Sequence, residues 1–127
     1  MAEEIDRIAA YYHEHDGGFW VAVRGDKLVG TFGLERAAPD AMELRRMYVD
    51  VASRRAGIGR RMLRYAEAEC RRRDIARLVL STAEIQDAAL ALYRGFGYQL
   101  VREEPADAVS NKTVGSGLRR FYFEKNL

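Results

Sequence analysis

The stretch RRAGIGRRML, Arg54–Leu63, places two glycines between two pairs of arginines, immediately before an apolar run. The apolar residues that continue from it recur every four positions: Ile58, Met62, Ala66 and Cys70. This spacing predicts an amphipathic helix from about Gly59 to Arg73. Its other face is expected to expose Arg60, Arg64, Glu67 and Arg71.

Glycines and arginines at the start of a helix are typical of a site for phosphate groups. A helix N-terminus carries unpaired N–H groups and a partial positive charge. Gly57 and Gly59 would let the backbone approach an anion closely, and the arginines would add fixed cations. The stretch therefore predicts a pyrophosphate cradle. A tight turn on a solvated basic face remains the alternative reading of the same residues.

Two nucleotide-binding motifs are excluded by the residues themselves. The phosphate-binding loop of nucleotide hydrolases needs Gly-Lys followed by Ser or Thr, which this stretch lacks. The dinucleotide fingerprint needs a third glycine where this chain has Met62.

The rest of the chain alternates helical and strand patterns. Apolar spacing predicts a first helix around Ile5–Tyr12, which Asp16-Gly17-Gly18 would end. A hairpin with its turn at Gly25-Asp26 should follow. The expected strands are 19–24, 27–36, about 42–49, 76–82, 98–103 and 119–125, with a second amphipathic helix beginning at Asp87. This order predicts an α/β fold in a single domain over residues 1–127, with helices covering a mixed sheet.

Composition narrows the class of protein. The 127 residues are 48% hydrophobic, which suits one compact core, and 21 basic against 19 acidic residues give a net charge of +2. We therefore expect no nucleic-acid partner. Cys70 is the only cysteine, so no disulfide framework or cysteine metal cage is expected, and His13 and His15 would face different directions on a helix. With no long apolar run and an acidic N-terminus, we expect a cytoplasmic protein without a membrane partner.

RRAGIGRRML resembles motif A of the GNAT N-acetyltransferase superfamily, Gln/Arg-x-x-Gly-x-Gly/Ala, with Arg54, Gly57 and Gly59 filling the pattern. AALALYRGFGY, Ala88–Tyr98, is similar to the downstream helix of that family. The resemblance covers about residues 19–127. It implies a GNAT-like, mostly antiparallel mixed sheet flanked by helices. It also implies acetyl-coenzyme A as donor, a small-molecule or peptide amine as acceptor, and direct attack without a covalent acyl-enzyme or a metal.

The resemblance also assigns residues to the donor site. The strand before the motif would lend backbone groups to the pantetheine arm and the acetyl carbonyl through Met47, Tyr48 and Val49. The pyrophosphate would lie on Arg54, Arg55, Gly57, Ile58, Gly59 and Arg60. Gln86 stands where many relatives have an asparagine that holds the pantetheine arm.

Two residues are candidates for catalysis by the same resemblance. Tyr93 matches a tyrosine that can protonate the departing thiolate, although it could equally be a buried core residue. Glu43 occupies the place where several relatives keep a general base for the acceptor amine. Alternatively, Glu43 pairs with Arg45 or Arg46. Glu35, near the end of the preceding strand, is a second candidate base. The loop SNKTVGSG, Ser110–Gly117, is expected to border the acceptor site.

Three further readings remain open from the sequence. A chain of this kind could bind acetyl-coenzyme A as a sensor or regulatory module without turnover, or use its arginine cluster on nucleic acid. Relatives usually begin with a strand for which we expect no counterpart here, and a trimmed or naturally minimal N-terminus is one explanation. The strand 19–24 would then be an open sheet edge. We hypothesise that a second copy covers this edge in a homodimer, which a monomer in sedimentation at micromolar concentration would contradict. The acceptor itself is not identified by the sequence.

Overall fold

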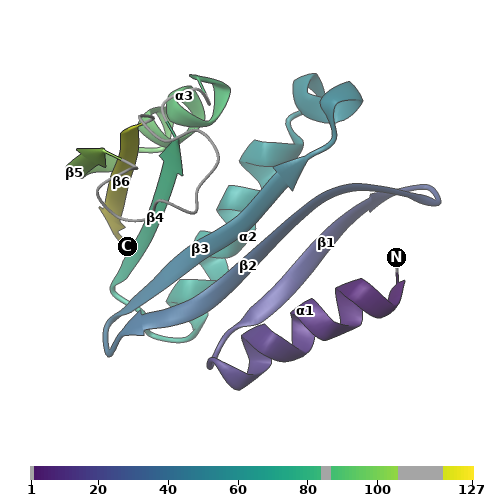
Figure 1. Cartoon of the computed structure of the whole chain (residues 1–127), viewed down its shortest axis with the longest axis horizontal. Coiled ribbons are helices and arrows are strands. Elements are labelled where there is room, and N and C mark those ends of the chain that lie inside the picture. Colours follow the sequence, from purple (N-terminus) through teal and green to yellow (C-terminus); the bar gives the residue numbers. More distant parts are fainter. Residues whose placement is uncertain (1, 84–86, 106–118) are drawn as a thin grey trace. The chain divides into compact units, whose positions relative to one another are not determined.

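The computed structural model describes residues 2–83, 87–105 and 119–127. Its strands form a six-stranded sheet in the order β1-β2-β3-β4-β6-β5, accompanied by helices (Figure 1). The elements are α1 (Ala2–Glu14), β1 (Gly18–Arg24), β2 (Lys27–Ala38), β3 (Ala41–Val49), the 3-10 helix η1 (Val51–Ala56), α2 (Ile58–Arg72), β4 (Arg77–Ala83), α3 (Asp87–Gly95), β5 (Gln99–Pro105) and β6 (Arg119–Asn126). The predicted sheet flanked by helices is confirmed.

The chain clusters into two compact units, residues 1–78 with Leu127 and residues 79–126. That residues 1–127 form one domain stays a prediction. The loop Ser110–Gly117 lies outside the described residues. Within the described part of the chain, no helix combines the length and apolarity needed to cross a membrane.

An antiparallel meander of β1, β2 and β3 forms the frame of the first unit. The β1–β2 hairpin closes with Arg24 opposite Lys27, and Gly25 in the turn has a φ of 61°. A two-residue turn of this kind needs positive φ, which glycine adopts without strain. The predicted hairpin and its turn are confirmed.

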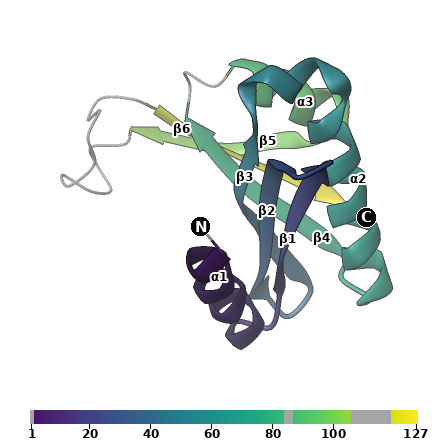
Figure 2. The same cartoon turned by 90° about the vertical axis from the view of Figure 1, so that its right-hand side faces the viewer.

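Helices α1 and α2 cover opposite faces of this meander, as Figure 2 shows. On one face, a Cβ added at Gly33 of β2 would lie 2.6 Å from Cζ of Tyr12 in α1. On the other face, a Cβ at Gly30 would lie 2.9 Å from the methyl carbon of Met62 in α2. Successive strand residues point to opposite faces. The two glycines are three positions apart and therefore lie on opposite faces. Because they have no side chains, α1 can pack closely on one face and α2 on the other.

The apolar face of α2 is buried as the four-residue spacing predicts. Leu63, Ala66 and Cys70 have no exposed surface, and Ile58 and Met62 are nearly as buried. Glu67 departs from the expectation of an exposed residue, because only 4% of its surface is accessible. It forms an ion pair with Arg71, whose guanidinium lies 3.6 Å from Oε1 of Glu67. A buried carboxylate is tolerated when a cation partners it in this way.

The end of α1 is joined to β2 by close backbone contact. Asp16 adopts the left-handed conformation with a φ of 61°, and the Gly17 N–H donates to the Tyr12 carbonyl at 2.8 Å. A Cβ at Gly17 would lie 1.7 Å from the carbonyl oxygen of Leu34, so only glycine fits there. The predicted stop is confirmed, although Asp16 and not a glycine makes the left-handed turn.

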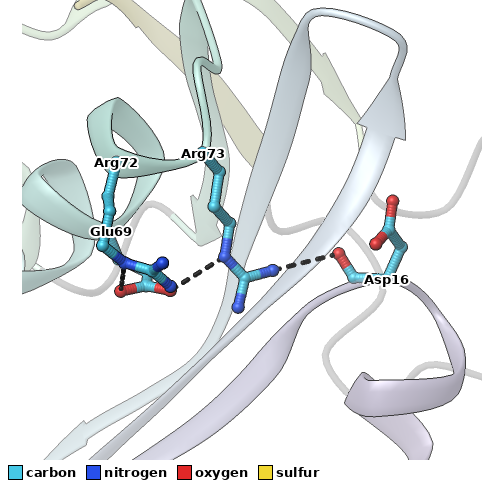
Figure 3. A network of polar contacts seen from close by, with 4 residues as sticks. All are labelled: Asp16, Glu69, Arg72 and Arg73. Carbon is cyan, nitrogen blue, oxygen red and sulfur yellow. Dashed lines mark hydrogen bonds and ion pairs between the residues drawn. The ribbon is translucent and has the colours of Figure 1, made fainter.

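A polar network links the ends of α1 and α2 (Figure 3). The buried carboxylate of Glu69 accepts hydrogen bonds from Arg72 and, at 2.8 Å, from Arg73. The Arg73 guanidinium also approaches the Asp16 carbonyl at 3.4 Å. Both arginines lower the pKa of Glu69, because they stabilise its charged form.

The second unit packs aromatic rings between α3 and the antiparallel pair β5–β6. The Tyr93 ring lies 6.0 Å from that of Tyr98 and 6.3 Å from that of Phe123, measured between centroids. All three side chains are buried. The Tyr98 N–H donates to the Tyr93 carbonyl at 3.0 Å and so closes the end of α3.

Replacing Gly33 by alanine should lower the free energy of unfolding by about 1–3 kcal/mol, because the new methyl would overlap the buried Tyr12 ring. Chemical denaturation measures this change. Gly95→Ala is the matched control, since a Cβ at Gly95 meets nothing within 4 Å. Equal stability of the two variants would contradict the packing of α1 against β2.

Candidate functional site

The connection between β3 and α2 contains the 3-10 helix η1. η1 ends at Ala56, and the next residue, Gly57, has a φ of 76° and directly precedes α2. A residue with a side chain would be strained in this left-handed conformation. The backbones of Arg54 and Arg55 belong to η1, while their side chains lie outside the described residues.

The N-terminus of α2 carries positive charge without any balancing group from its own first turn. Gly57 provides no side-chain cap, and the first turn contains no acidic residue. Instead, Arg60 and Arg61 occupy the first turn and are exposed. Cations there are unfavourable by roughly 0.3–1 kcal/mol each, because the helix dipole is already positive at this end. An anion bound at this end would interact favourably with both the helix dipole and the arginines.

The geometry of Gly57 leaves room for such an anion. Apart from its chain neighbours, a Cβ built on Gly57 meets no atom of the described side chains or backbone within 4 Å. The backbone ladder of α2 starts with the Arg61 N–H donating to the Gly57 carbonyl at 3.1 Å. The earlier N–H groups, including those of Ile58 and Gly59, thus point out of the helix end. Open space, backbone donors and cations together fit the phosphates of a cofactor.

β3 contains a bulge just before the residues assigned to the donor. Gly33 pairs with Arg45 and Thr31 pairs with Tyr48, so one residue of β2 faces two residues of β3, Arg46 and Met47. Arg46 has a φ of 53°, an uncommon conformation for a residue with a side chain. The Thr31 hydroxyl donates to the Arg46 carbonyl at 2.9 Å. This bond satisfies a carbonyl that the broken ladder cannot serve.

Bulges re-aim a strand and end regular pairing, and they are common beside active sites. Met47, Tyr48 and Val49 follow this bulge directly, on the stretch that leads through Asp50 into η1. The Tyr48 side chain is half exposed, and those of Met47 and Val49 are partly buried. The first unit therefore holds both backbone segments of the proposed donor site, 47–49 and 57–60.

Two carboxylates face one another across β2 and β3. Glu35 is the register partner of Glu43. Glu35 accepts a hydrogen bond from Arg45 at 2.6 Å and another from the Tyr11 hydroxyl at 3.1 Å. Arg45 forms its ion pair with Glu35, and its charge also acts on Glu43.

The two carboxylates differ in acidity for identifiable reasons. Burial is the largest influence on both and raises the pKa. For Glu35, however, the hydrogen bonds from Arg45 and Tyr11 outweigh burial, and its pKa is lowered. For Glu43, the charge of Arg45 opposes burial less strongly and the charge of Glu35 adds to it, so its pKa is raised. A carboxylate with a raised pKa is a stronger base once ionised.

Tyr93 lies in the second unit, on α3, and is 6% exposed. Burial raises the pKa of its hydroxyl to about 12. This hydroxyl therefore remains protonated at neutral pH and can act as a donor. Gln86 lies outside the described residues.

Other reactive side chains are accounted for by packing. Cys70 is fully buried in α2, and burial raises the pKa of its thiol to about 11, which makes it unreactive. No cluster of three or more metal-binding side chains occurs among residues 2–83, 87–105 and 119–127.

Sequence reasoning missed the bulge at Arg46 and the Tyr11–Glu35–Arg45 network. Arg46 carries no local signal, because its left-handed conformation follows from a register shift against β2. Tyr11 lies 24 positions from Glu35, so helical spacing alone could not join them.

Comparisons with known proteins agree with this geometry. Residues 1–98 match the model of the acetyltransferase (GNAT) family. N-acetyltransferase family 8 member 3 of Rattus norvegicus is 34% identical over 107 residues, which are 80% of this chain and 47% of that protein. The chain thus spans about half the length of the curated relatives it matches.

Solved structures show the same fold. The ribosomal-protein-alanine N-acetyltransferase of Brucella melitensis superposes with a TM-score of 0.82 at 24% identity, over 98% of this chain and 78% of that one. A GNAT family acetyltransferase from Elizabethkingia anophelis, with acetyl-CoA bound, gives a TM-score of 0.80 at 15% identity, over 95% and 82% of the two chains. The family match, the relatives and the fold lead to one conclusion: this chain belongs to the GNAT acetyltransferase family.

Proposed function

We propose that this chain transfers an acetyl group from acetyl-coenzyme A to a primary amine. The observation that carries the proposal is the N-terminus of α2, where an open glycine and exposed arginines lie together with no acidic residue in the first turn. Such an end favours the pyrophosphate of coenzyme A, and membership of the GNAT family supports the same donor. A sensor that binds the donor without turnover is not favoured, because the relatives found are named as acetyltransferases.

In the proposed donor site, backbone groups of residues 57–60 would hold the pyrophosphate, with Arg54 and Arg55 adding charge. Met47, Tyr48 and Val49 would hold the pantetheine arm and the acetyl carbonyl, and Gln86 would also contact the arm. The bulge at Arg46 supports this role for the strand, because it interrupts regular pairing where a ligand would need backbone groups.

The proposed reaction is a direct attack of the amine nitrogen on the thioester carbonyl. A C–N bond forms, the C–S bond breaks, and the acetyl group passes to the acceptor in one enzyme-bound complex. The amine must first lose a proton, because it is mostly protonated at neutral pH. Glu43 would accept that proton, directly or through water. The nitrogen loses a second proton to solvent as the amide forms, while the Tyr93 hydroxyl would donate one to the departing thiolate and regain one from solvent, so that one proton is released overall. Orientation of the two reactants would supply much of the acceleration.

Gly57→Ala should weaken acetyl-coenzyme A binding by about tenfold or more, because a methyl would occupy the space proposed for phosphate. Calorimetric titration measures the affinity. Gly25→Ala is the matched control: Gly25 also has positive φ and also faces open space, so it shares the backbone strain but lies in the β1–β2 turn. Loss of binding in both variants, or in neither, would contradict the cradle.

Tyr93→Phe should lower kcat by about 10²-fold while the affinity for acetyl-coenzyme A is retained, because the thiolate would lose its proton donor. Steady-state kinetics measures kcat. Tyr98→Phe is the control, since Tyr98 is equally buried and packs against the Tyr93 ring. A similar fall in both variants would indicate a packing role for Tyr93 instead.

Glu43 should impose an acidic limb on the pH profile of kcat/KM for the acceptor, when kcat/KM is expressed per unprotonated amine. Its pKa is raised, so the rate should fall as the pH drops through a value above the usual range of a glutamate. Glu43→Gln should remove this limb and lower the rate by about 10²-fold or more. Glu35→Gln should keep the limb but move it to lower pH, because Glu35 contributes to the raised pKa of Glu43. An unchanged limb in Glu43→Gln would exclude Glu43 as the base.

A further inference from the structure

A groove of about 450 Å³ lies between α1 and β3 in the first unit. We call it the arginine groove, and its lining is Arg7, Ile8, Tyr11, Tyr12, Arg45 and Arg46. Arg45 follows Glu43 by two residues on β3, so the two share one face of the strand. That face is the one that α1 covers, because Tyr11 of α1 contacts Glu35, the register partner of Glu43. The groove therefore adjoins the proposed base.

The side chains that the structure describes around the groove leave an excess of cations. Its lining contains three arginines and no carboxylate. Among the side chains that the structure describes, the carboxylate in an ion pair with a groove arginine is that of Glu35, and its partner is Arg45. Burial raises the pKa of the Tyr12 hydroxyl, and the charges of Arg45 and Arg46, together with a hydrogen bond from Arg46, oppose this rise. Arg7 and Arg46 are both exposed, so their guanidinium groups can meet a ligand from solvent.

We propose that the arginine groove binds a carboxylate of the acceptor, so that the preferred acceptor is a small amine bearing an acidic group. The proposal rests on the acetyltransferase function proposed above and narrows its substrate class. An arginine and a carboxylate can form two parallel charge-assisted hydrogen bonds, which fix orientation as well as add affinity. With the carboxylate on Arg7 and Arg46, the amine of the same molecule would be directed toward Glu43.

The charges of the groove favour one orientation of such an acceptor, with its carboxylate near the arginines and its amine near Glu43. Arg45 is already held by Glu35, which is itself fixed by Tyr11. The ion pair with Glu35 thus leaves Arg7 and Arg46 as the groove arginines proposed to bind the ligand. Ile8 and Tyr12 supply the less polar part of the lining. An ammonium group alone would be repelled by the arginines, whereas an amine with a carboxylate would be attracted as a whole.

A series of three acceptors on one carbon skeleton tests the proposal: aspartate, asparagine and aspartic acid diamide carry two, one and no carboxylates. Acetyl transfer is followed by release of the coenzyme A thiol, and kcat/KM is expressed per unprotonated amine. We expect kcat/KM to fall along the series by about tenfold for each carboxylate lost, mainly through KM. Equal values for all three acceptors, or the highest value for the diamide, would overturn the inference.

Variants of the groove arginines locate the effect. Arg7→Gln should reduce the preference for aspartate over the diamide by about tenfold. Arg46→Asn should do the same, and asparagine is chosen because it tolerates the left-handed conformation at this position. Arg24→Gln is the control, because Arg24 is an exposed arginine at the end of β1 outside the groove. A preference unchanged in both groove variants, or lost equally in the control, would overturn the assignment to this groove.

Failure of the inference and failure of the proposed function give different results. Transfer to uncharged amines without any preference for the acids would leave the acetyltransferase function intact and overturn the acidic acceptor. No thiol release with any amine, by a chain that still binds acetyl-coenzyme A in calorimetry, would overturn both.

Discussion

The interruption of the β2–β3 ladder at Arg46 is the constraint on which the candidate site depends. Before it, β3 alternates regularly, with Met42 and Leu44 buried and Glu43 between them. After it, the strand has gained one residue against β2, and its last residues lead into η1 and α2. Thr31 holds the bulge through a hydroxyl bond to the Arg46 carbonyl. The proposed base thus lies before the bulge and the proposed donor segments after it.

The two faces of the meander provide different environments. The face under α2 is apolar and rigid, with side chains such as Leu34 and Leu63 fully buried. The face under α1 carries Glu35, Glu43 and Arg45, whose mutual charges set the acidity of each. A carboxylate keeps a raised pKa only where burial outweighs its cation partners. Here Arg45 forms its ion pair with Glu35 and lowers the pKa of that carboxyl. The pKa of Glu43 stays raised, so Glu43 is the weaker acid.

The parts of the fold that the sequence predicted well are those governed by local chemistry. The α2 helix followed from apolar residues at every fourth position, and the hairpin from the turn at Gly25-Asp26. The parts that were missed depend on partners distant in sequence. Glu67 is buried by tertiary packing, and the Arg46 bulge follows from pairing with Thr31 and Gly33. The phosphate cradle was predicted from the glycines and arginines themselves, and the other residues of the candidate site from the family resemblance. The different acidities of Glu35 and Glu43 required the structure.

The way α1 is attached has a mechanical consequence. Its C-terminal end is fixed to β2, because Gly17 lies against the Leu34 carbonyl and the Arg36 N–H donates to the His15 carbonyl at 3.1 Å. Arg7 lies eight residues before His15, roughly 12 Å along the helix. A helix pivoting at its fixed end acts as a lever, so a tilt of about 10° would move Arg7 by about 2 Å while Tyr11 moved about half as far. Such a tilt would thus shift the part of the groove near Arg7 about twice as far as the part near Tyr11.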